Sequence, residues 1–250
     1  MDREQVSNST KYDRYPRIFK AVQRATNGDS LRILSFGCST GEEPRTLAEL
    51  YFPRSQIIGM DVSADAVATA KVNTAHLPNV NILLSGPDSL AEHAPYDVIF
   101  AMSVLCRWPI AKRMDDLSQL FPFARFEASV AALIEQVKPG GLLVTHNTSY
   151  SITQSRLIRF LDLILTARID QPGQVTRFAP DGHKMVPGEI ATDCIFRKRE
   201  KPWADAPDIP LRIEHESGAT LGTIWLPPIA AREQTAPAES VAYEPAAAEE

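Results

Sequence analysis

The chain has 250 residues, of which 44% are apolar, and a formal net charge of −5 at pH 7. A chain of this length buries enough surface to fold without disulfides or a structural metal, and its widely spaced cysteines, Cys38, Cys106 and Cys194, exclude a disulfide framework and a Cys-x-x-Cys metal site. The mildly acidic charge disfavours a nucleic-acid partner, because the phosphate backbone requires a basic surface. There is neither an apolar run long enough to span a bilayer nor a signal-peptide core, so we expect a soluble, cytoplasmic protein that does not bind membranes.

Apolar runs alternate with helical spacing along most of the chain. The strands predicted first, in chain order, lie at 31–36, 56–61, 80–84, 96–102 and 142–145. The helices among them are predicted at 42–51, 64–75, 124–137 and 155–165, with a Lys-Pro-Gly-Gly turn at 138–141. Strands alternating with helices predict an α/β fold around a mostly parallel sheet. Two later strands, near 191–197 and 220–226, have no long helix between them, so we expect them to form an antiparallel end to this sheet.

A glycine-rich loop follows the first predicted strand. From Gly37 to Gly41 it reads Gly-Cys-Ser-Thr-Gly, and two glutamates open the next helix. Glycines here let the backbone turn tightly and approach a ligand, and the helix N-terminus adds unpaired N–H groups. Asp61 ends the second strand, where a carboxylate can accept hydrogen bonds from both hydroxyls of a ribose. These residues predict a nucleoside-binding half-domain, and the competing interpretation is a structural turn beside a surface aspartate.

Three kinds of site use such a loop. A dinucleotide site usually has Gly-x-Gly-x-x-Gly, whereas this loop is Gly-x-Ser-x-Gly, and the two glutamates would repel a pyrophosphate. The nucleophile elbow of α/β-hydrolases has the same spacing, with Ser39 as nucleophile and His146 or His183 available as base, but that elbow normally follows several strands. S-adenosylmethionine has a ribose and an amino-acid head but no phosphate, so the acidic loop favours this cofactor.

Recognisable motifs lie at 10–19, 37–44, 58–63, 96–105 and 138–143. The segment at 37–44, Gly-Cys-Ser-Thr-Gly-Glu-Glu-Pro, resembles the first motif of the CheR-type class I methyltransferases, and the other segments are similar to further motifs of that family. The resemblance implies S-adenosylmethionine as the cofactor, Asp61 as the ribose acid and Arg14 as an active-site arginine. It also implies a Rossmann-like class I methyltransferase fold, α/β, with a mostly parallel seven-stranded sheet and helices on both faces.

Three regions are expected along the chain. Residues 1–30 are predicted to form an N-terminal helical segment that acts as a lid, and 31–226 to form the S-adenosylmethionine-binding methyltransferase domain. Residues 227–250 are rich in Ala, Glu and Pro and have little apolar surface to bury, which predicts a disordered tail.

The chain departs from the CheR pattern at informative positions. Ser103 and Arg107 stand where the family has Asn and Tyr, and the short segment before Thr10 leaves no room for its N-terminal helical domain. We therefore expect an S-adenosylmethionine-dependent methyltransferase that acts on a small or medium-sized acceptor by in-line methyl transfer. One alternative is a CheR-type protein carboxyl (glutamate) O-methyltransferase, so the partner is a small molecule or a protein carboxylate. The non-enzyme alternative is a degenerate cofactor-binding partner protein, and the oligomeric state does not follow from the sequence.

The predicted cofactor site is built from the glycine loop and from the ends of the second, third and fourth strands. Asp88 is expected to accept the adenine amino group unless its loop is a plain turn, and Cys38 to pack as a small apolar residue within the loop. The predicted cofactor-binding residues are Gly37, Cys38, Ser39, Thr40, Gly41, Glu42, Asp61, Val62, Asp88, Ala101, Met102 and Ser103.

On the acceptor side, two residues are predicted to be catalytic and no metal ligand is expected. Arg14 would orient a carboxylate acceptor, and His146 would be the base for a phenol, amine or thiol unless it bonds a loop carbonyl instead. The tyrosines are expected to form a lid or to pack as half-buried rings, and the arginine to face substrate or solvent. The predicted substrate contacts are Tyr12, Tyr15, Arg107 and Tyr150.

Overall fold

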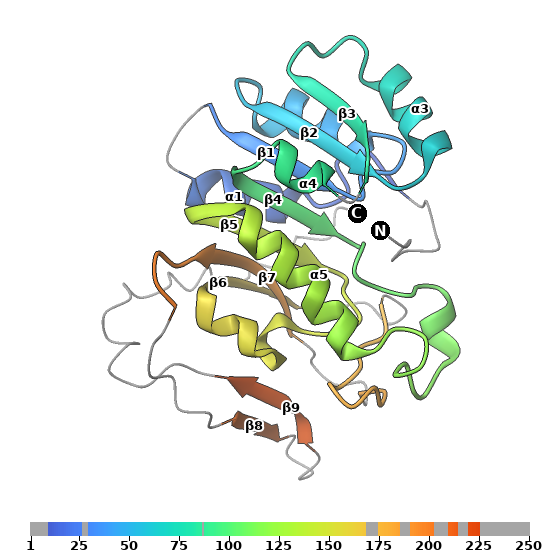
Figure 1. Ribbon diagram of the computed structural model, residues 1–250, viewed down its shortest axis with the longest axis vertical. Coiled ribbons are helices and arrows are strands. Elements are labelled where there is room, and N and C mark those ends of the chain that lie inside the picture. The colour runs from blue at the N-terminus through green and yellow to red at the C-terminus, as the bar shows by residue number, and fades with distance from the viewer. Residues whose placement is uncertain are drawn as a thin grey trace, which may run out of the picture.

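The computed structural model describes residues 10–26, 30–86, 88–168, 175–185, 191–202, 210–214 and 220–225. Its centre is a seven-stranded sheet with the order β3-β2-β1-β4-β5-β7-β6 (Figure 1). All neighbours pair in parallel except β7, which is antiparallel to β5 and to β6. The strands are β1 (Arg32–Phe36), β2 (Gln56–Asp61), β3 (Val80–Leu84), β4 (Tyr96–Met102), β5 (Val137–His146), β6 (Leu161–Arg168) and β7 (Ala191–Lys198). This topology confirms the predicted Rossmann-like, mostly parallel sheet.

Helices cover both faces of the sheet, with α4 and α5 in front of it and α1 behind it in Figure 1. Successive side chains of β1 point to opposite faces of the sheet. Ile33 lies in one core with Phe19 of α1, and Leu34 lies in the other core with Phe126 of α5. The α-helices are α1 (Pro16–Ala25), α2 (Glu42–Thr46), α3 (Ala64–Asn73), α4 (Ser89–Glu92) and α5 (Phe123–Gln136). A π-helical turn, η1 (Leu47–Tyr51), directly follows α2. The 3₁₀ turns are η2 (Ile110–Arg113), η3 (Ile152–Gln154) and η4 (Arg156–Phe160).

The predicted helix at 155–165 is wrong. Residues 156–160 form only the short turn η4, and the chain then enters β6, which pairs with β7. A short apolar run fits a helix or a strand equally well. Here the open edge of β7 supplies ladder hydrogen bonds, and Arg199 forms an ion pair with Asp162 of β6.

The two late predicted strands belong to different sheets. The strand predicted near 191–197 is β7, and it belongs to the antiparallel end of the sheet as expected. The strand predicted near 220–226 is β9 (Thr220–Trp225), but it pairs with β8 (Pro210–Glu214) in a separate two-stranded sheet. The predicted tail at 227–250 lies outside the described residues.

The strand order reverses beside β1, with β2 and β3 on one side and β4 on the other. Open α/β sheets bind ligands at this switch point, at the carboxyl ends of the strands. The glycine loop leaves β1 there, and Ser103 follows β4 at the same edge.

Candidate active site

The glycine loop is folded back against β2. The backbone N–H groups of Gly37 and Cys38 both donate to the Met60 carbonyl, at 2.7 and 2.9 Å. Gly37 has φ +75°, and an added Cβ would lie 2.6 Å from a methyl carbon of Val104. Gly41, which precedes α2, has φ +93°. Glycine is therefore required at both turns of the loop.

The Asp61 carboxylate holds this loop to the end of β2. One carboxylate oxygen accepts from the Ser39 N–H at 2.8 Å, and the other accepts from the Ser63 N–H at 2.9 Å. Each oxygen keeps a further lone pair, so the predicted bonds to ribose hydroxyls remain chemically possible. The Thr40 hydroxyl lies 2.7 and 2.9 Å from the carboxylate oxygens of Glu42, which orients this second acid at the start of α2.

A cleft of about 440 Å³, open to solvent, lies between the loop, the end of β4 and the segment that precedes and enters α1. Seven of the predicted site residues line it: Arg14, Tyr15, Gly37, Cys38, Ser39, Met102 and Ser103. The lining also includes residues that were not predicted, namely Thr10, Lys11, Phe19, Glu43 and Thr46.

Glu43 is the only carboxylate among the described residues that line the cleft. It accepts a hydrogen bond from the Ser35 hydroxyl at 2.8 Å. Burial raises the pKa of Glu43 to about 7, although the Ser35 hydrogen bond and the Arg14 charge lower it. Arg14 lies over the Tyr15 ring, 5.2 Å from the ring centroid. The cleft thus presents a cation and a titratable carboxyl group. Glu43 could have been found from the sequence, because it is the second glutamate of the first motif.

Tyr15, Ser103 and Asn147 form a closed set of polar contacts, which we call the polar triad. The two hydroxyl oxygens are 2.6 Å apart, and the Asn147 amide nitrogen donates to each of them at 3.1 Å. Asn147 was missed as a site residue, and the signal that could have found it is its position directly after the predicted base, His146.

His146 packs edge-to-face against Tyr15, with ring centroids 5.2 Å apart. Its backbone carbonyl accepts from the Ser103 N–H at 2.7 Å. Burial lowers the pKa of His146 to about 4, and the charges of Arg177 and Arg14 lower it further. The imidazole is therefore neutral at pH 7 but a weak base, and it does not line the cleft itself.

The segment from Thr10 to Tyr15, here called the strap, is tied to α2 and η1. The Tyr12 hydroxyl donates to Glu49 at 2.7 Å, the Asp13 N–H donates to the Thr46 hydroxyl at 2.9 Å, and the Tyr51 hydroxyl donates to Asp13 at 2.8 Å. Tyr12 therefore anchors the strap on its outer side and does not line the cleft, contrary to its predicted substrate contact.

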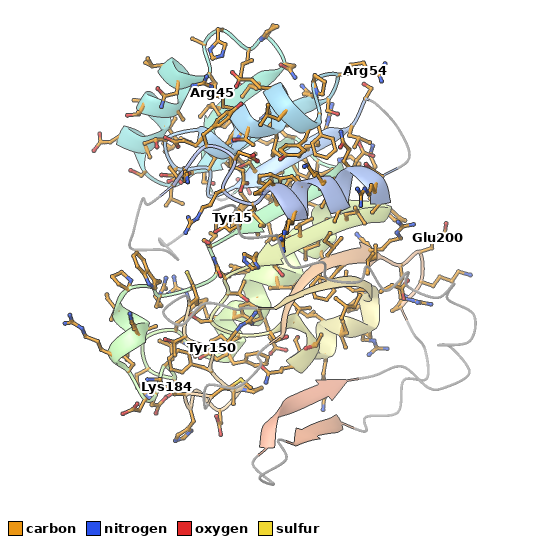
Figure 2. The ribbon with its side chains drawn as sticks, turned by 180° about the vertical axis from the view of Figure 1, so that it is seen from behind. Tyr15, Arg45, Arg54, Tyr150, Lys184 and Glu200 are labelled. Atoms are coloured by element: carbon orange, nitrogen blue, oxygen red, sulfur yellow. The ribbon has the colours of Figure 1, made fainter. Side chains whose placement is uncertain are left out.

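Two other predicted substrate contacts are core residues. Tyr150 is fully buried, and its hydroxyl donates to the Phe121 carbonyl at 2.6 Å. Arg107 is 5% exposed and lies over the Phe121 ring at 4.6 Å, so it does not face solvent, and it does not line the cleft. Figure 2 places Tyr150 in the lower part of the molecule, away from Tyr15. These aromatic rings pack together because each buries a large apolar area.

Several predicted cofactor residues also lie off the cleft wall. Ala101 is fully buried within the sheet, Asp88 is exposed at the start of α4, and Val62 is half-buried next to Asp61; none of them lines the cleft, and neither do Thr40, Gly41, Glu42 and Asp61. Cys38 lines the cleft and is also buried with Val67, Ala70 and Ile82, which fits its predicted packing role.

Residues 34–143, which run from β1 into β5 and include the glycine loop, match a family model described as a methyltransferase domain. The chain carries a methyltransferase domain. Its cofactor is S-adenosylmethionine, which the acidic loop and Asp61 suit because the site needs no phosphate-binding surface. Among the described residues, no helix of this methyltransferase is long and apolar enough to cross a membrane.

Solved structures of methyltransferases resemble the chain weakly. The N-methyltransferase NodS from Bradyrhizobium japonicum, in complex with S-adenosylhomocysteine, has a TM-score of 0.49 and 15% identity over 75% of this chain and 87% of its own. A putative rRNA-methylase from Clostridium thermocellum has a TM-score of 0.48 and 10% identity over 77% of this chain and 99% of its own.

PKMT2 from Rickettsia typhi has a TM-score of 0.39 and 20% identity over 52% of this chain, which spans only 24% of that protein. No curated protein matches the sequence significantly. The acceptor of this methyltransferase therefore does not follow from its relatives.

Proposed function

We propose that the protein methylates a small or medium-sized acceptor by in-line transfer from S-adenosylmethionine. The observation that carries the proposal is the cleft itself, which is lined both by Gly37, Cys38 and Ser39 of the glycine loop and by Arg14, Tyr15 and Ser103. A cleft with cofactor-binding and acceptor-facing walls suits a reaction in which the main task of the protein is to align two bound molecules.

The residues on the cofactor side fit the groups of S-adenosylmethionine. Asp61 would accept hydrogen bonds from the ribose hydroxyls, since its carboxylate is fixed at the end of β2. Arg14 and Glu43 lie in the same cleft with opposite charges, so Arg14 would hold the cofactor carboxylate and Glu43 its ammonium group. When bound, the cofactor supplies a methyl group already activated by the sulfonium charge.

The residues on the acceptor side would orient the methyl acceptor rather than remove a proton from it. With its pKa lowered to about 4, His146 is a poor acceptor for the proton of an amine or phenol. The polar triad instead offers hydrogen-bond donors to the acceptor. The strap lines part of this region and, with a ligand bound, would limit the access of water, which would compete for these donors.

A CheR-type protein carboxyl methyltransferase is the second candidate. The observation that favours it is the position of Arg14, because the resemblance to that family makes this residue the active-site arginine and it does line the cleft. A carboxylate is ionised at neutral pH and needs no base, which suits a site with a weakly basic histidine.

The test combines binding and turnover. Calorimetry should show micromolar binding of S-adenosylhomocysteine and no binding of NAD. A screen of metabolite pools with radiolabelled methyl donor should then transfer label to a small molecule, whereas base-labile label on protein would favour the CheR-type candidate. Binding of NAD in place of S-adenosylhomocysteine would contradict the proposal, and binding without any turnover would favour the partner-protein interpretation.

A further inference from the structure

The polar triad joins three parts of the chain at the wall of the cleft. Tyr15 immediately precedes α1, Ser103 follows β4 and Asn147 follows β5. Each group lies within 2.6–3.1 Å of the other two. Tyr15 and Ser103 line the cleft, and Asn147 is 4% exposed behind them.

Two residues of the triad adopt an uncommon backbone conformation. Ser103 and Asn147 have φ of +58° and +54°, values that residues with a side chain seldom adopt. The Asn147 amide oxygen is buried and accepts no hydrogen bond from any residue that the structure describes, which is unfavourable for a polar atom removed from water. Strained residues that persist in a fold are concentrated at functional sites.

The side chains of the polar triad carry four hydrogens that can be donated in hydrogen bonds, two on the amide and one on each hydroxyl. Asn147 uses both of its amide hydrogens, one for each hydroxyl oxygen. The two hydroxyls carry one proton each, and one of these protons lies in the 2.6 Å contact between them. The other is not paired within the triad, because both hydroxyls contact the Asn147 amide nitrogen and not its oxygen, and both hydroxyls belong to residues of the cleft wall. The triad therefore directs one hydrogen-bond donor to a ligand in the cleft.

We propose that Asn147 is a positioning residue that orients the hydroxyls of Tyr15 and Ser103 to donate a hydrogen bond to an anionic oxygen of the methyl acceptor. This inference rests on the proposed function and adds the chemical class of the acceptor. The charges of the cleft agree with it, because Lys11 also lines the cleft and is left to face the acceptor when Arg14 and Glu43 hold the carboxylate and ammonium groups of the cofactor. An ammonium group on the acceptor would meet the wrong end of the hydroxyl dipole and the Lys11 charge.

The test uses two small probes of matched shape and opposite charge, benzoate and benzylamine. The full chain is first saturated with S-adenosylhomocysteine, and the affinity of each probe is then measured by calorimetry. We expect benzoate to bind at least tenfold more tightly than benzylamine.

Two variants address the triad. Asn147→Asp keeps the side-chain shape and tolerates a positive φ, but its carboxylate only accepts hydrogen bonds and would take up the spare hydroxyl proton. Tyr15→Phe removes one hydroxyl without adding charge. Each should weaken benzoate binding at least fivefold and reduce the ratio of benzoate to benzylamine affinity, while the affinity for S-adenosylhomocysteine stays within about threefold.

The matched control is Asn79→Asp. The Asn79 amide donates to the carbonyls of Ser55 and Pro53 directly before β3, at the opposite edge of the sheet from the cleft. It should leave benzoate affinity unchanged within twofold, and if Asn147→Asp does not fold, Tyr15→Phe decides the outcome.

The proposal is overturned if the parent protein binds neither probe, if benzylamine binds as tightly as benzoate, or if Tyr15→Phe keeps the benzoate affinity of the parent. A parent protein that fails to bind S-adenosylhomocysteine would instead contradict the proposed function, so the two failures are distinguishable.

Discussion

Two carboxyl groups beside the glycine loop are held in different ways. Asp61 accepts two backbone N–H bonds, from Ser39 and Ser63, which keep its carboxylate fixed beside the loop. Glu43 accepts one hydroxyl bond from Ser35, and burial raises its pKa to about 7. At the scale of single residues, the first is a fixed acceptor for neutral hydroxyls and the second is a charge that varies with pH.

Asp61→Ala should weaken S-adenosylhomocysteine binding by about ten- to a hundredfold. It removes the acceptor for the ribose hydroxyls; the net loss of one charge-assisted hydrogen bond is worth about 1.5–3 kcal/mol, and every 1.4 kcal/mol is about tenfold in affinity. Calorimetry of the variant measures this. Asp65→Ala is the matched control, because Asp65 is an exposed acid in the first turn of α3. If Asp61→Ala binds like the parent, the ribose assignment is wrong.

The affinity for S-adenosylhomocysteine should rise with pH through the pKa of Glu43. Below pH 7 the raised pKa leaves Glu43 mostly protonated, so binding of an ammonium group must first ionise it. With a pKa of about 7, the binding at pH 6 should be about tenfold weaker than at pH 8. Calorimetry across this range checks the slope, and Glu43→Gln should flatten it. A pH-independent affinity in the parent would show that Glu43 does not meet the ammonium group.

At the scale of elements, the strap is held to the domain by hydrogen bonds to side chains of α2 and η1. Glu49 of η1 accepts from Tyr12, Arg45 and His76, and these hydrogen bonds hold the pKa of its carboxyl at about 2. Four residues of the strap line the cleft. Loosening its anchors should therefore affect ligand binding more than stability.

Tyr12→Phe tests this link. Loss of one exposed hydrogen bond to a carboxylate is worth about 0.5–1.5 kcal/mol, so S-adenosylhomocysteine should bind about two- to tenfold more weakly, with a melting temperature within a few degrees of the parent. The control is Tyr96→Phe, which loses a hydroxyl bonded to the Leu90 carbonyl at the amino end of β4, away from the cleft. It should keep the parent affinity. Equal affinities for Tyr12→Phe and the parent would show that the strap does not depend on Glu49.

At the scale of the whole molecule, the sheet and its two cores involve residues between Ile18 and Phe196. The composition from 227 onward, rich in Ala, Glu and Pro, has little apolar surface to offset the entropy of ordering. A chain ending at Pro228 should therefore keep the melting temperature and the S-adenosylhomocysteine affinity of the full chain. Scanning calorimetry of both chains measures this, and a drop of more than a few degrees would show that the last residues dock on the domain.

The sequence alone determined the parts of the site that depend on local chemistry. Gly37 and Gly41 adopt backbone angles that favour glycine, and Asp61 ends a strand whose bounds are those predicted, so the cofactor wall could be named from spacing. Whether 161–165 becomes helix or strand depended on the free edge of β7, which no local pattern encodes. In the same way Tyr150, Arg107 and Tyr12 turned out to be structural, because burial and side-chain partners arise only when distant segments pack. Only the tertiary structure brought Tyr15, Ser103 and Asn147 together, because a hydrogen bond depends on distance in space and their separations along the chain leave no periodic signal.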